Sequence, residues 1–589
     1  MNRGAGTADP GADRAGRILW GSLLAFELLR IVAILQPGMF GWSMNSARFL
    51  APTVSWPLEI VLVAGLLPVT ARWIVRGFEA LADALQRDPR RAIPVAAFLA
   101  AWVVWLIPDQ VHFTGDFQLR LSSASQPGSP ESLFPQELPL DLLLHVRLPQ
   151  WLASRGFAWA ALEPRLLGAL EAALLALIAI RFSNVVAARG AFAIAMISLA
   201  FFGGHLVLFT GMNKAFSELV LCAAAVGVWG IAVIEGGADP LPLGLAAGLA
   251  VAMHRSGIAL LPAALFPPIV ALVRGAGRYR MRAALAILLP LIACALTFPA
   301  ARRAWTAVDF PRLLPWIAEP PSAPALPGEW LGESLNALFA LAPGCIPLLP
   351  LVALRRPAGA TRAQRMLLAL QIAPLLLALL VLRAPQGLFR DFDMFAPLAT
   401  LGVIGVSGWF FKAFESPGRW SWLLAGVALA AAVPTVELAI AQSDLDAGLR
   451  RARAFVLEEP KRSDAVRGRT WGFLAMRSWR LGDSNAAAIA ADSAVTTAPT
   501  KTNFMLLAAA NQARGDLAAA RSAYQRVLEL DPRDWRNWIG FAEVALASRD
   551  TLAAEHALDQ ALTINPRAEY ARELLRRIPG AGAAPAPRR

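Results

Sequence analysis

The sequence has little charge and little cysteine, and each shortage excludes a class of protein. Charged residues make up only 16% of the 589 residues and hydrophobic residues 57%, whereas an average soluble domain carries roughly 25% charge. This composition excludes a soluble globular protein. The three cysteines, Cys222, Cys294 and Cys345, all lie inside apolar runs, which excludes a disulfide framework and a CxxC metal site.

The positive charge comes almost entirely from arginine. The net charge is +13, and 51 of the 55 cationic residues are Arg. Many of them lie in short loops between apolar runs, where such charge orients membrane helices and meets anionic lipid. We therefore expect contact with membrane lipids and no nucleic-acid partner.

Apolar runs of about 20 residues recur along the first three quarters of the chain and predict an all-α, polytopic bundle of about 13 membrane-spanning helices. Residues 1–17 are expected to form a cytoplasmic tail and residues 18–440 the transmembrane domain. The predicted spans lie near residues 18–35, 57–75, 92–107, 161–180, 190–209, 215–234, 241–253, 256–273, 283–300, 334–354, 366–383, 395–411 and 420–440.

The distribution of arginine also predicts the orientation. With the N-terminus inside, the short cytoplasmic loops hold most of the loop Arg and Lys residues, as the positive-inside rule requires. An odd number of spans then places the C-terminal part outside the cytoplasm. We expect an integral protein of the bacterial inner membrane with its C-terminal domain on the periplasmic side.

The first long outer loop covers residues 108–160. Within it, residues 138–152 predict an amphipathic helix that lies on the membrane surface with Trp151 at headgroup depth. An ordinary packed loop helix is the alternative.

A repeat begins after residue 440. Five columns recur at intervals of 33 and 34 residues: Trp471, Phe504 and Trp538; Leu474, Leu507 and Phe541; Asp483, Asp516 and Asp550; Ala487, Ala520 and Ala554; Pro499, Pro532 and Pro566. This pattern resembles the tetratricopeptide repeat, an α-solenoid of helix pairs. It predicts a repeat domain over 471–578 with a capping helix at 567–578. Residues 441–470 form a linker or degenerate repeat, and 579–589 a disordered tail.

Ionisable residues gather on one predicted side of the membrane. Such residues are costly near lipid and usually functional. The candidates on the non-cytoplasmic side are Asp109, His112, Asp116, Lys214, His254, Arg255, Arg390, Asp391 and Asp393. A transporter would instead bury its charges near mid-membrane with access from both faces.

Asp109 and Asp116 lie in one segment directly after the third span. A carboxylate there can take a proton from an acceptor hydroxyl or hold a divalent cation. The alternative is that Asp109 caps a helix and Asp116 makes a turn.

The cationic candidates favour an anionic ligand. Arg255 can fork two donors onto a phosphate, and His254 can add a third. A plain turn with a snorkelling arginine is the alternative for this pair. For Arg390, Asp391 and Asp393 the alternative is an internal ion pair that fixes the loop.

An acidic loop after a span, a long outer loop with a membrane-surface helix and a later cationic cluster together resemble the GT-C class of integral-membrane glycosyltransferases. This class includes protein O-mannosyltransferases and aminoarabinose transferases. A multispan portion followed by repeats also resembles the eukaryotic O-mannosyltransferases that carry tetratricopeptide repeats. The chain departs from the usual pattern because two spans, not one, precede its acidic loop.

The resemblance implies an inverting transfer of a sugar from a polyprenyl-phosphate donor to a hydroxyl of an acceptor, with the protein acceptor favoured by the repeats. Asp116 would be the catalytic carboxylate, with Asp109 second. The remaining candidates would bind substrate: His112, Lys214, His254, Arg255, Arg390, Asp391 and Asp393. The sequence does not name a metal.

Two other functions stay open at this point. An O-antigen ligase or O-oligosaccharyltransferase also has many spans and outer Arg and His residues, but its key histidine is expected in a late outer loop, and the loop 301–333 has none. A non-enzymatic membrane scaffold that binds proteins through its repeats is the third possibility, although it leaves the outer acidic and basic groups unexplained.

Overall fold

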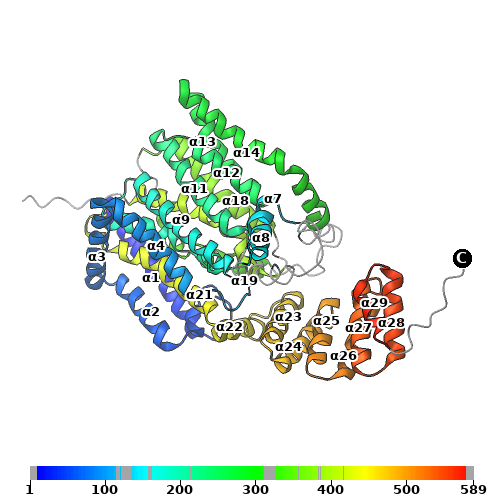
Figure 1. Ribbon diagram of the computed structural model, residues 1–589. Coiled ribbons are helices and arrows are strands. Elements are labelled where there is room, and N and C mark those ends of the chain that lie inside the picture. The colour runs from blue at the N-terminus through cyan, green and yellow to red at the C-terminus, as the bar shows by residue number, and fades with distance from the viewer. Residues whose placement is uncertain are drawn as a thin grey trace, which may run out of the picture. The chain divides into compact units, whose positions relative to one another are not determined.

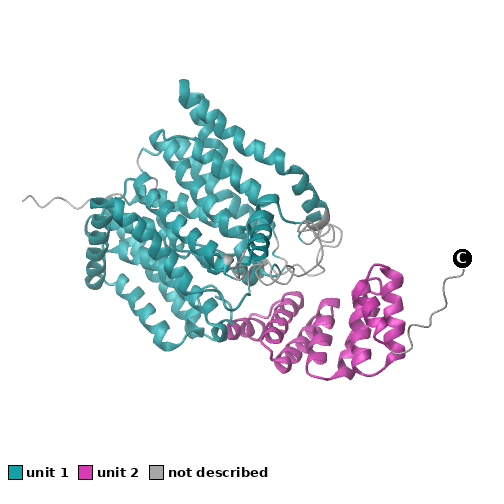
Figure 2. Ribbon diagram, viewed as in Figure 1, with its two compact units in different colours: residues 1–448 teal, residues 449–589 magenta. Residues whose placement is uncertain are grey.

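The computed structural model describes residues 10–113, 120, 134, 136–156, 162–212, 214–310, 327–355, 357, 359–382, 384, 386–414 and 417–578. The chain divides into two compact units, residues 1–448 and 449–589 (Figure 2). Throughout the described residues every regular element is a helix (Figure 1). The all-α prediction is therefore confirmed.

Unit 1 is a bundle of helices. Its first half contains α1 (Pro10–Leu35), η1 (Ser46–Phe49), α2 (Pro52–Leu66), α3 (Pro68–Arg87), α4 (Pro89–Leu106), α7 (Pro139–Leu142), η2 (Leu143–Arg147), α8 (Leu148–Ser154), α9 (Glu163–Val185), α10 (Ala191–Phe201), η4 (Gly204–Thr210) and α11 (Phe216–Gly236). Its second half contains α12 (Leu241–Met253), η5 (Arg255–Leu260), α13 (Leu261–Arg274), α14 (Gly277–Ala304), η6 (Trp305–Asp309), α16 (Pro327–Leu341), η7 (Pro343–Leu348), α17 (Leu349–Leu354), α18 (Arg362–Val381), α19 (Leu388–Asp391), η8 (Phe392–Phe395), α20 (Ala396–Ala413), η9 (Gly418–Trp420) and α21 (Leu423–Ser443).

Unit 1 contains helices that are apolar enough to cross a membrane. Within the described ranges nine helices meet the length and composition of a span, or up to 12 if three bent pairs each count as one. One further apolar helix, α12, is shorter. Each of the predicted apolar runs coincides with one of these elements, but the count of 13 crossings stays a prediction.

Three of the predicted spans are broken helices. The run at 57–75 breaks between α2 and α3 with a bend of 97°, and α10 and η4 meet at 63°. α16 meets the continuous stretch of η7 and α17 at 101°. The first break has a local cause, because Pro68 disfavours helical backbone at Leu67, which is extended with φ −98° and ψ 126°. The prediction of a continuous helix over 57–75 was wrong for this reason.

The centre and the periphery of unit 1 differ in burial. Of the 18-residue apolar window within Leu388–Ala413, 89% of the residues are buried, and 78% of the window within Gly418–Ser443. The share is only 6% for Pro89–Leu106. Large apolar side chains such as Leu296 and Leu380 are exposed on the outer helices. An apolar exterior of this extent needs a partner or lipid to cover it.

The two ends of unit 1 carry different contacts. Arg419, just before α21, pairs with Asp13 at 2.7 Å, whereas the carbonyl oxygen of Gln442, near the other end of α21, binds the segment that follows α4. The 21 residues of α21 rise roughly 30 Å along the helix axis. Arg419 lies in the loop between the predicted spans at 395–411 and 420–440, which the predicted orientation places in the cytoplasm. This residue and the predicted outer segment therefore lie at opposite ends of the bundle.

Unit 2 consists of antiparallel helix pairs. After α22 (Leu445–Leu457), which contains the boundary between the units, come α23 (Asp464–Arg480), α24 (Ser484–Thr497), α25 (Lys501–Ala513), α26 (Leu517–Leu530), α27 (Trp535–Ala547), α28 (Thr551–Ile564) and α29 (Glu569–Arg576). The first paired helix starts at Asp464, ahead of the expected repeat boundary at 471.

Two of the repeat columns have clear structural roles. Asp483, Asp516 and Asp550 precede the second helix of each pair, and each side chain accepts the backbone N–H three residues on, at 2.9 to 3.1 Å. This is the N-cap role for which Asp is preferred. Ala487, Ala520 and Ala554 are fully buried where the helices cross.

A third periodic feature lies in the turn within each pair. Gly482 and Gly515 have φ of +83° and +84°, and Arg549 at the equivalent position has φ of +61°. A side chain makes this left-handed conformation unfavourable.

We expect Arg549→Gly to stabilise the third pair by about 1 kcal/mol, measured as slower hydrogen exchange in α27 and α28. Gly515→Ala should have the opposite effect on the second pair, and protection that is unchanged in Arg549→Gly would contradict the prediction.

Candidate functional site

The segment after α4 is tied to two distant elements. The backbone N–H of Asp109 donates to Thr210 O of η4 at 2.9 Å, and those of Gln110 and Val111 donate to Gln442 O of α21 at 2.9 and 3.3 Å. At Gly168 of α9 a Cβ would collide with the carbonyl group of Phe209. Glycine at that position therefore lets α9 approach η4, the element that holds Asp109.

Asp109 itself holds a turn. Its side chain is buried, and Oδ1 accepts the backbone N–H groups of Val111 at 2.9 Å and His112 at 3.0 Å. Oδ2 lies 3.6 Å from Nδ1 of His112, whose backbone has φ of +54°. Asp109 therefore has a capping role, as in the alternative, but it caps a turn and not a helix. Asp116, the first catalytic candidate, lies outside the described residues.

Arg390 is joined to the same segment. Its Nε donates to the carbonyl oxygen of Phe113 at 2.9 Å, and the guanidinium carbon lies 5.5 Å from the centre of the Phe113 ring. The loop after α4 and the start of α19 are thus in direct contact although they are far apart in the sequence.

Lys214 and Asp393 form an ion pair. Lys214 Nζ lies 2.7 Å from Asp393 Oδ2, and the Asp393 side chain is fully buried. Asp391 Oδ2 accepts the backbone N–H of Gln386 at 2.8 Å. Lys214 Nζ also lies 5.1 Å from the centre of the Phe216 ring. Asp393 is therefore ion-paired, but with Lys214 from outside the Arg390–Asp393 motif, so this is not the internal pair of the alternative.

Arg255 binds a carboxylate with both arms of its guanidinium group. Nε and Nη2 donate to the two carboxylate oxygens of Asp309 at 2.6 and 2.8 Å, and Nη1 donates to Gln136 O at 2.8 Å. Sequence reasoning did not single out Asp309, which ends η6. The fork predicted for a phosphate is therefore formed, and in this structure an internal carboxylate fills it.

His254 lies between Arg255 and Phe216. Its Nδ1 is 2.7 Å from Ser256 Oγ, and its ring makes an edge contact with Phe216 at 5.0 Å between centroids. Burial, assisted by the Arg255 charge, lowers the pKa of His254 to about 3. A neutral imidazole adds no positive charge for an anionic ligand.

The loop helix over 138–152 buries polar residues and exposes apolar ones. It forms α7, η2 and α8, and its polar residues Asp141 and His145 are buried, whereas Leu143 and Trp151 are about half exposed. The polar face is thus turned into the protein and the apolar face outwards. Arg155 covers the Trp151 ring at 4.1 Å.

This inward face belongs to a buried ionic chain that sequence reasoning missed. Asp141 Oδ1 lies 3.0 Å from Arg120 Nη2 and 2.8 Å from His145 Nδ1. Arg120 also pairs with Glu137 at 3.0 Å, and His145 Nε2 lies 3.1 Å from Glu218 Oε1. The i, i+4 spacing of Asp141 and His145, one helical turn apart, is the signal that could have revealed the pair.

Two glutamates extend this buried ionic chain towards the helices of the bundle. Glu218 accepts a hydrogen bond from Ser217 at 3.1 Å, and the buried Glu171 of α9 lies close enough to Glu218 to interact electrostatically. Both glutamates fall within apolar helices, where an ionisable residue is a functional hypothesis by default.

The ionic state of His145 follows from its neighbours. Burial opposes a charged imidazole, but the Glu218 carboxylate and the hydrogen bond to Asp141 outweigh it and raise the pKa of His145 to about 10. The hydrogen bond from His145 and the charge of Arg120 outweigh burial in the same way and lower the pKa of Asp141. His145 is therefore an imidazolium held between two carboxylates at neutral pH.

These contacts form three groups at the end of unit 1 that also holds Gln442, and together we call them the polar belt. Phe216 links two of the groups, because it contacts Lys214 and His254. The neighbouring residues Gln136 and Glu137 link the third, because they bind Arg255 and Arg120. The polar belt comprises Asp109, His112, Arg120, Asp141, His145, Lys214, Glu218, His254, Arg255, Asp309, Arg390, Asp391 and Asp393. It brings together every described candidate from the sequence. Nowhere in the described ranges do three His, Cys, Asp or Glu side chains form a group that could hold a metal ion.

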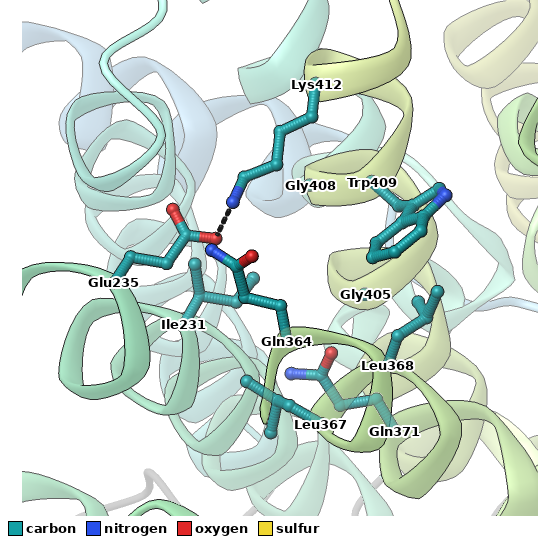
Figure 3. Close-up of a pocket in the computed structure, with 10 residues that line it drawn as sticks. All are labelled: Ile231, Glu235, Gln364, Leu367, Leu368, Gln371, Gly405, Gly408, Trp409 and Lys412. Carbon is teal, nitrogen blue, oxygen red and sulfur yellow. Dashed lines mark ion pairs between the residues drawn. The ribbon is translucent and has the colours of Figure 1, made fainter. Parts of the chain in front are cut away.

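Two cavities lie away from the polar belt. In unit 1 a cavity of about 20 Å³ lies between α11, α18 and α20, beside the Glu235–Lys412 ion pair (Figure 3). That volume holds one water molecule at most, so the cavity takes no substrate. In unit 2 a groove of about 710 Å³ is lined by side chains of α26, α27 and α28, including Trp538, Phe541 and His556.

Comparison with known proteins identifies the repeats. A family model described as tetratricopeptide repeat matches residues 512–578, from the end of α25 through α29. No curated protein matches the chain. A solved structure titled "Crystal structure of APC/C hetero-tetramer Cut9-Hcn1" aligns with 76% of this chain and 98% of its own, at 12% identity and a TM-score of 0.22. Residues 512–578 are thus tetratricopeptide repeat sequence, as the intervals of 33 and 34 residues predicted.

Proposed function

We propose that this chain is an integral-membrane glycosyltransferase that moves a sugar from a polyprenyl-phosphate donor to a hydroxyl group of an acceptor on the non-cytoplasmic side. The observation that supports it best is the polar belt, in which carboxylates and cations from several separate segments meet at one end of an apolar helix bundle. A lipid-linked substrate needs such a place, where its phosphate and sugar leave the lipid phase beside its apolar tail.

The phosphate would bind at Arg255. A guanidinium fork presents two parallel N–H donors, and this geometry suits a carboxylate and a phosphate equally. Asp309 holds the fork in that geometry at 2.6 and 2.8 Å. A lipid phosphate would take the place of Asp309, and Lys214 and Arg390 supply further positive charge in the same belt.

The acceptor hydroxyl would be activated by Asp116. The backbone of residues 109–111 anchors the start of this loop to η4 and α21, and Phe113 contacts Arg390. Asp116 would accept the hydroxyl proton while the hydroxyl oxygen attacks the anomeric carbon. The bond to the lipid phosphate breaks in the same step, and the cations of the belt stabilise the charge on the leaving phosphate. One in-line attack inverts the anomeric carbon.

The repeats would bind a protein. Tetratricopeptide repeats are stacked helix pairs whose surfaces take up partner segments, and the groove in unit 2 offers aromatic side chains for this purpose. A peptide or protein is therefore the proposed acceptor or partner. If unit 1 binds no donor, this same surface supports the second function, a membrane scaffold that recruits proteins.

Donor binding tests the proposal. Arg255→Lys keeps the charge but cannot reproduce two parallel hydrogen bonds, so we expect the affinity for radiolabelled polyprenyl-phosphate sugars to fall about tenfold or more, in line with a loss of at least about 1.4 kcal/mol. The matched control is Arg282→Lys, because Arg282 also forks onto an aspartate, Asp239, outside the polar belt. Equal affinity in wild type and both variants would remove the phosphate role, and no donor binding by the wild type would favour the scaffold.

A further inference from the structure

A second buried ionic cluster lies outside the polar belt. Arg30 of α1 is fully buried and is surrounded by Glu27 of the same helix, Glu59 of α2 and Glu437 of α21. Its guanidinium nitrogens lie 2.6 Å from Glu59, 3.1 to 3.3 Å from Glu437 and 3.3 Å from Glu27. The proposed function does not use this cluster.

The charges of the cluster do not balance. Three carboxylates around one guanidinium leave two excess negative charges in a place where water is nearly absent, and a buried uncompensated charge is very costly. No described group of three acidic, His or Cys side chains can hold a metal ion. The compensating charge that fits this geometry is a proton, which lowers the excess from two negative charges to one. The remaining excess is shared by carboxylates that include Glu59, whose side chain is 14% exposed and so the least buried of the three.

Two unpaired oxygen atoms indicate where a proton binds. Oε1 of Glu27 and Oε2 of Glu59 are buried and have no hydrogen-bond partner, and the Glu27 side chain is only 4% exposed. Both carboxyl groups contact the same guanidinium group, Glu27 at Nε and Glu59 at Nη2. An ionised carboxylate can only accept hydrogen bonds, so a proton on one of the two groups would supply the donor that these buried oxygens lack.

The proton is best assigned to Glu27. Glu437 is bound by two guanidinium nitrogens and Glu59 by the shortest contact, whereas Glu27 has one contact of 3.3 Å to Nε. Other charged groups on the elements packed against α1, α2 and α21 have different partners or lie beyond the bend into α3. Three of these groups have other partners: Arg48 donates to Gly38 O, His205 contacts Phe201 O, and Arg419 pairs with Asp13. The groups beyond the bend are those of α3, namely Arg72, Arg76, Glu79, Asp83 and Arg87.

We propose that Glu27, Arg30, Glu59 and Glu437 form a proton-binding site in which Glu27 carries the proton and donates it to Glu59. The bound proton lets Arg30 hold α1, α2 and α21 together. Glu437 is five residues before Gln442, about 7.5 Å along the helix, and Gln442 O anchors the Asp109 segment. The site thus fixes the end of α21 on which the polar belt is built, and it does not depend on the proposed function.

Thermal unfolding of the full chain in detergent tests the assignment. A glutamine side chain can donate to Glu59 as a protonated glutamate does, so Glu27→Gln should keep Tm within about 2 °C of wild type. Glu437→Gln is the matched control, because it removes an ionised partner of buried Arg30. Its Tm should fall by on the order of 10 °C.

The reverse pattern overturns the proposal. A Glu27→Gln variant that loses as much Tm as Glu437→Gln, or that fails to fold, would mean that Glu27 is ionised in the native protein. If Glu437→Gln itself does not fold, the Tm of Glu27→Gln relative to wild type still decides.

Chemical labelling gives an independent readout. Dicyclohexylcarbodiimide reacts with protonated carboxyl groups in apolar surroundings, so we expect mass spectrometry of the treated wild-type protein at neutral pH to find the adduct on Glu27. Glu235, whose carboxylate is ion-paired with Lys412, should stay unmodified. An adduct on Glu59 or Glu437 with none on Glu27 would overturn the assignment of the proton.

Discussion

Exchange of Asp141 for Asn is expected to lower the free energy of unfolding by about 3–5 kcal/mol, the cost of removing one partner from a buried ion pair. Asp141 is 1% exposed and contacts both Arg120 at 3.0 Å and His145 at 2.8 Å. Asparagine fills the same volume but leaves the positive charges of Arg120 and His145 without this carboxylate. Thermal unfolding of the full chain in detergent measures the loss.

Asp83→Asn is the control for this prediction. Asp83 pairs with Arg87 at 2.9 Å, but both side chains are more than half exposed, and such surface pairs contribute only about 0.2–1 kcal/mol. A Tm for Asp141→Asn as high as that of Asp83→Asn would show that the buried ionic chain does not hold the loop to the bundle.

The same substitution should change the pH dependence of stability. The pKa of His145 is raised to about 10 from an ordinary value near about 6.5. A raised histidine pKa stabilises the folded state fully below the unfolded value, and this contribution is lost as the pH rises towards the folded value. Wild-type Tm should therefore decline between about pH 6.5 and pH 10, with a shallower decline in Asp141→Asn. Parallel profiles would contradict the assigned imidazolium.

The helices were largely predictable because their signal is local. A run of apolar residues near 20 in length marks a helix whatever it packs against, and the Asp column marks the caps of the repeat helices because the capped N–H lies three residues away. The break at Leu67 also has a local cause, Pro68, which signals its position in the sequence. The angle between α2 and α3 could not be predicted, because the apolar run continues across the proline.

The candidate site was less predictable because its contacts are long-range. Topology placed Asp109, Lys214 and Arg390 on one side, and the structure places them at one end of unit 1. The partners Asp393 and Asp309 could not be assigned, because no sequence spacing links elements that meet only through the fold. The sequence also did not show which face of the loop helix packs against the protein, since amphipathicity shows that two faces differ but does not show which one is buried.

The proposed chemistry depends most on Asp116. Asp116→Asn keeps the shape of the side chain and removes the charge that accepts a proton, so transfer should fall at least about 10²-fold, the low end for loss of a general base. Stability and donor binding should be nearly unchanged, because the donor phosphate is assigned to Arg255. The measurement is sugar transfer by the full chain in liposomes supplied with radiolabelled polyprenyl-phosphate sugars.

Asp109→Asn is the matched control, because it makes the same change in the same segment at a residue whose Oδ1 caps a turn. The asparagine oxygen accepts the same two N–H groups, and Asn is as good a capping residue as Asp. We therefore expect a loss of less than about tenfold for Asp109→Asn. A larger loss there than in Asp116→Asn would exchange the two roles. Transfer near the wild-type rate in the double variant would remove the acidic loop from the mechanism, because Asp109 and Asp116 are the two carboxylates of residues 108–117.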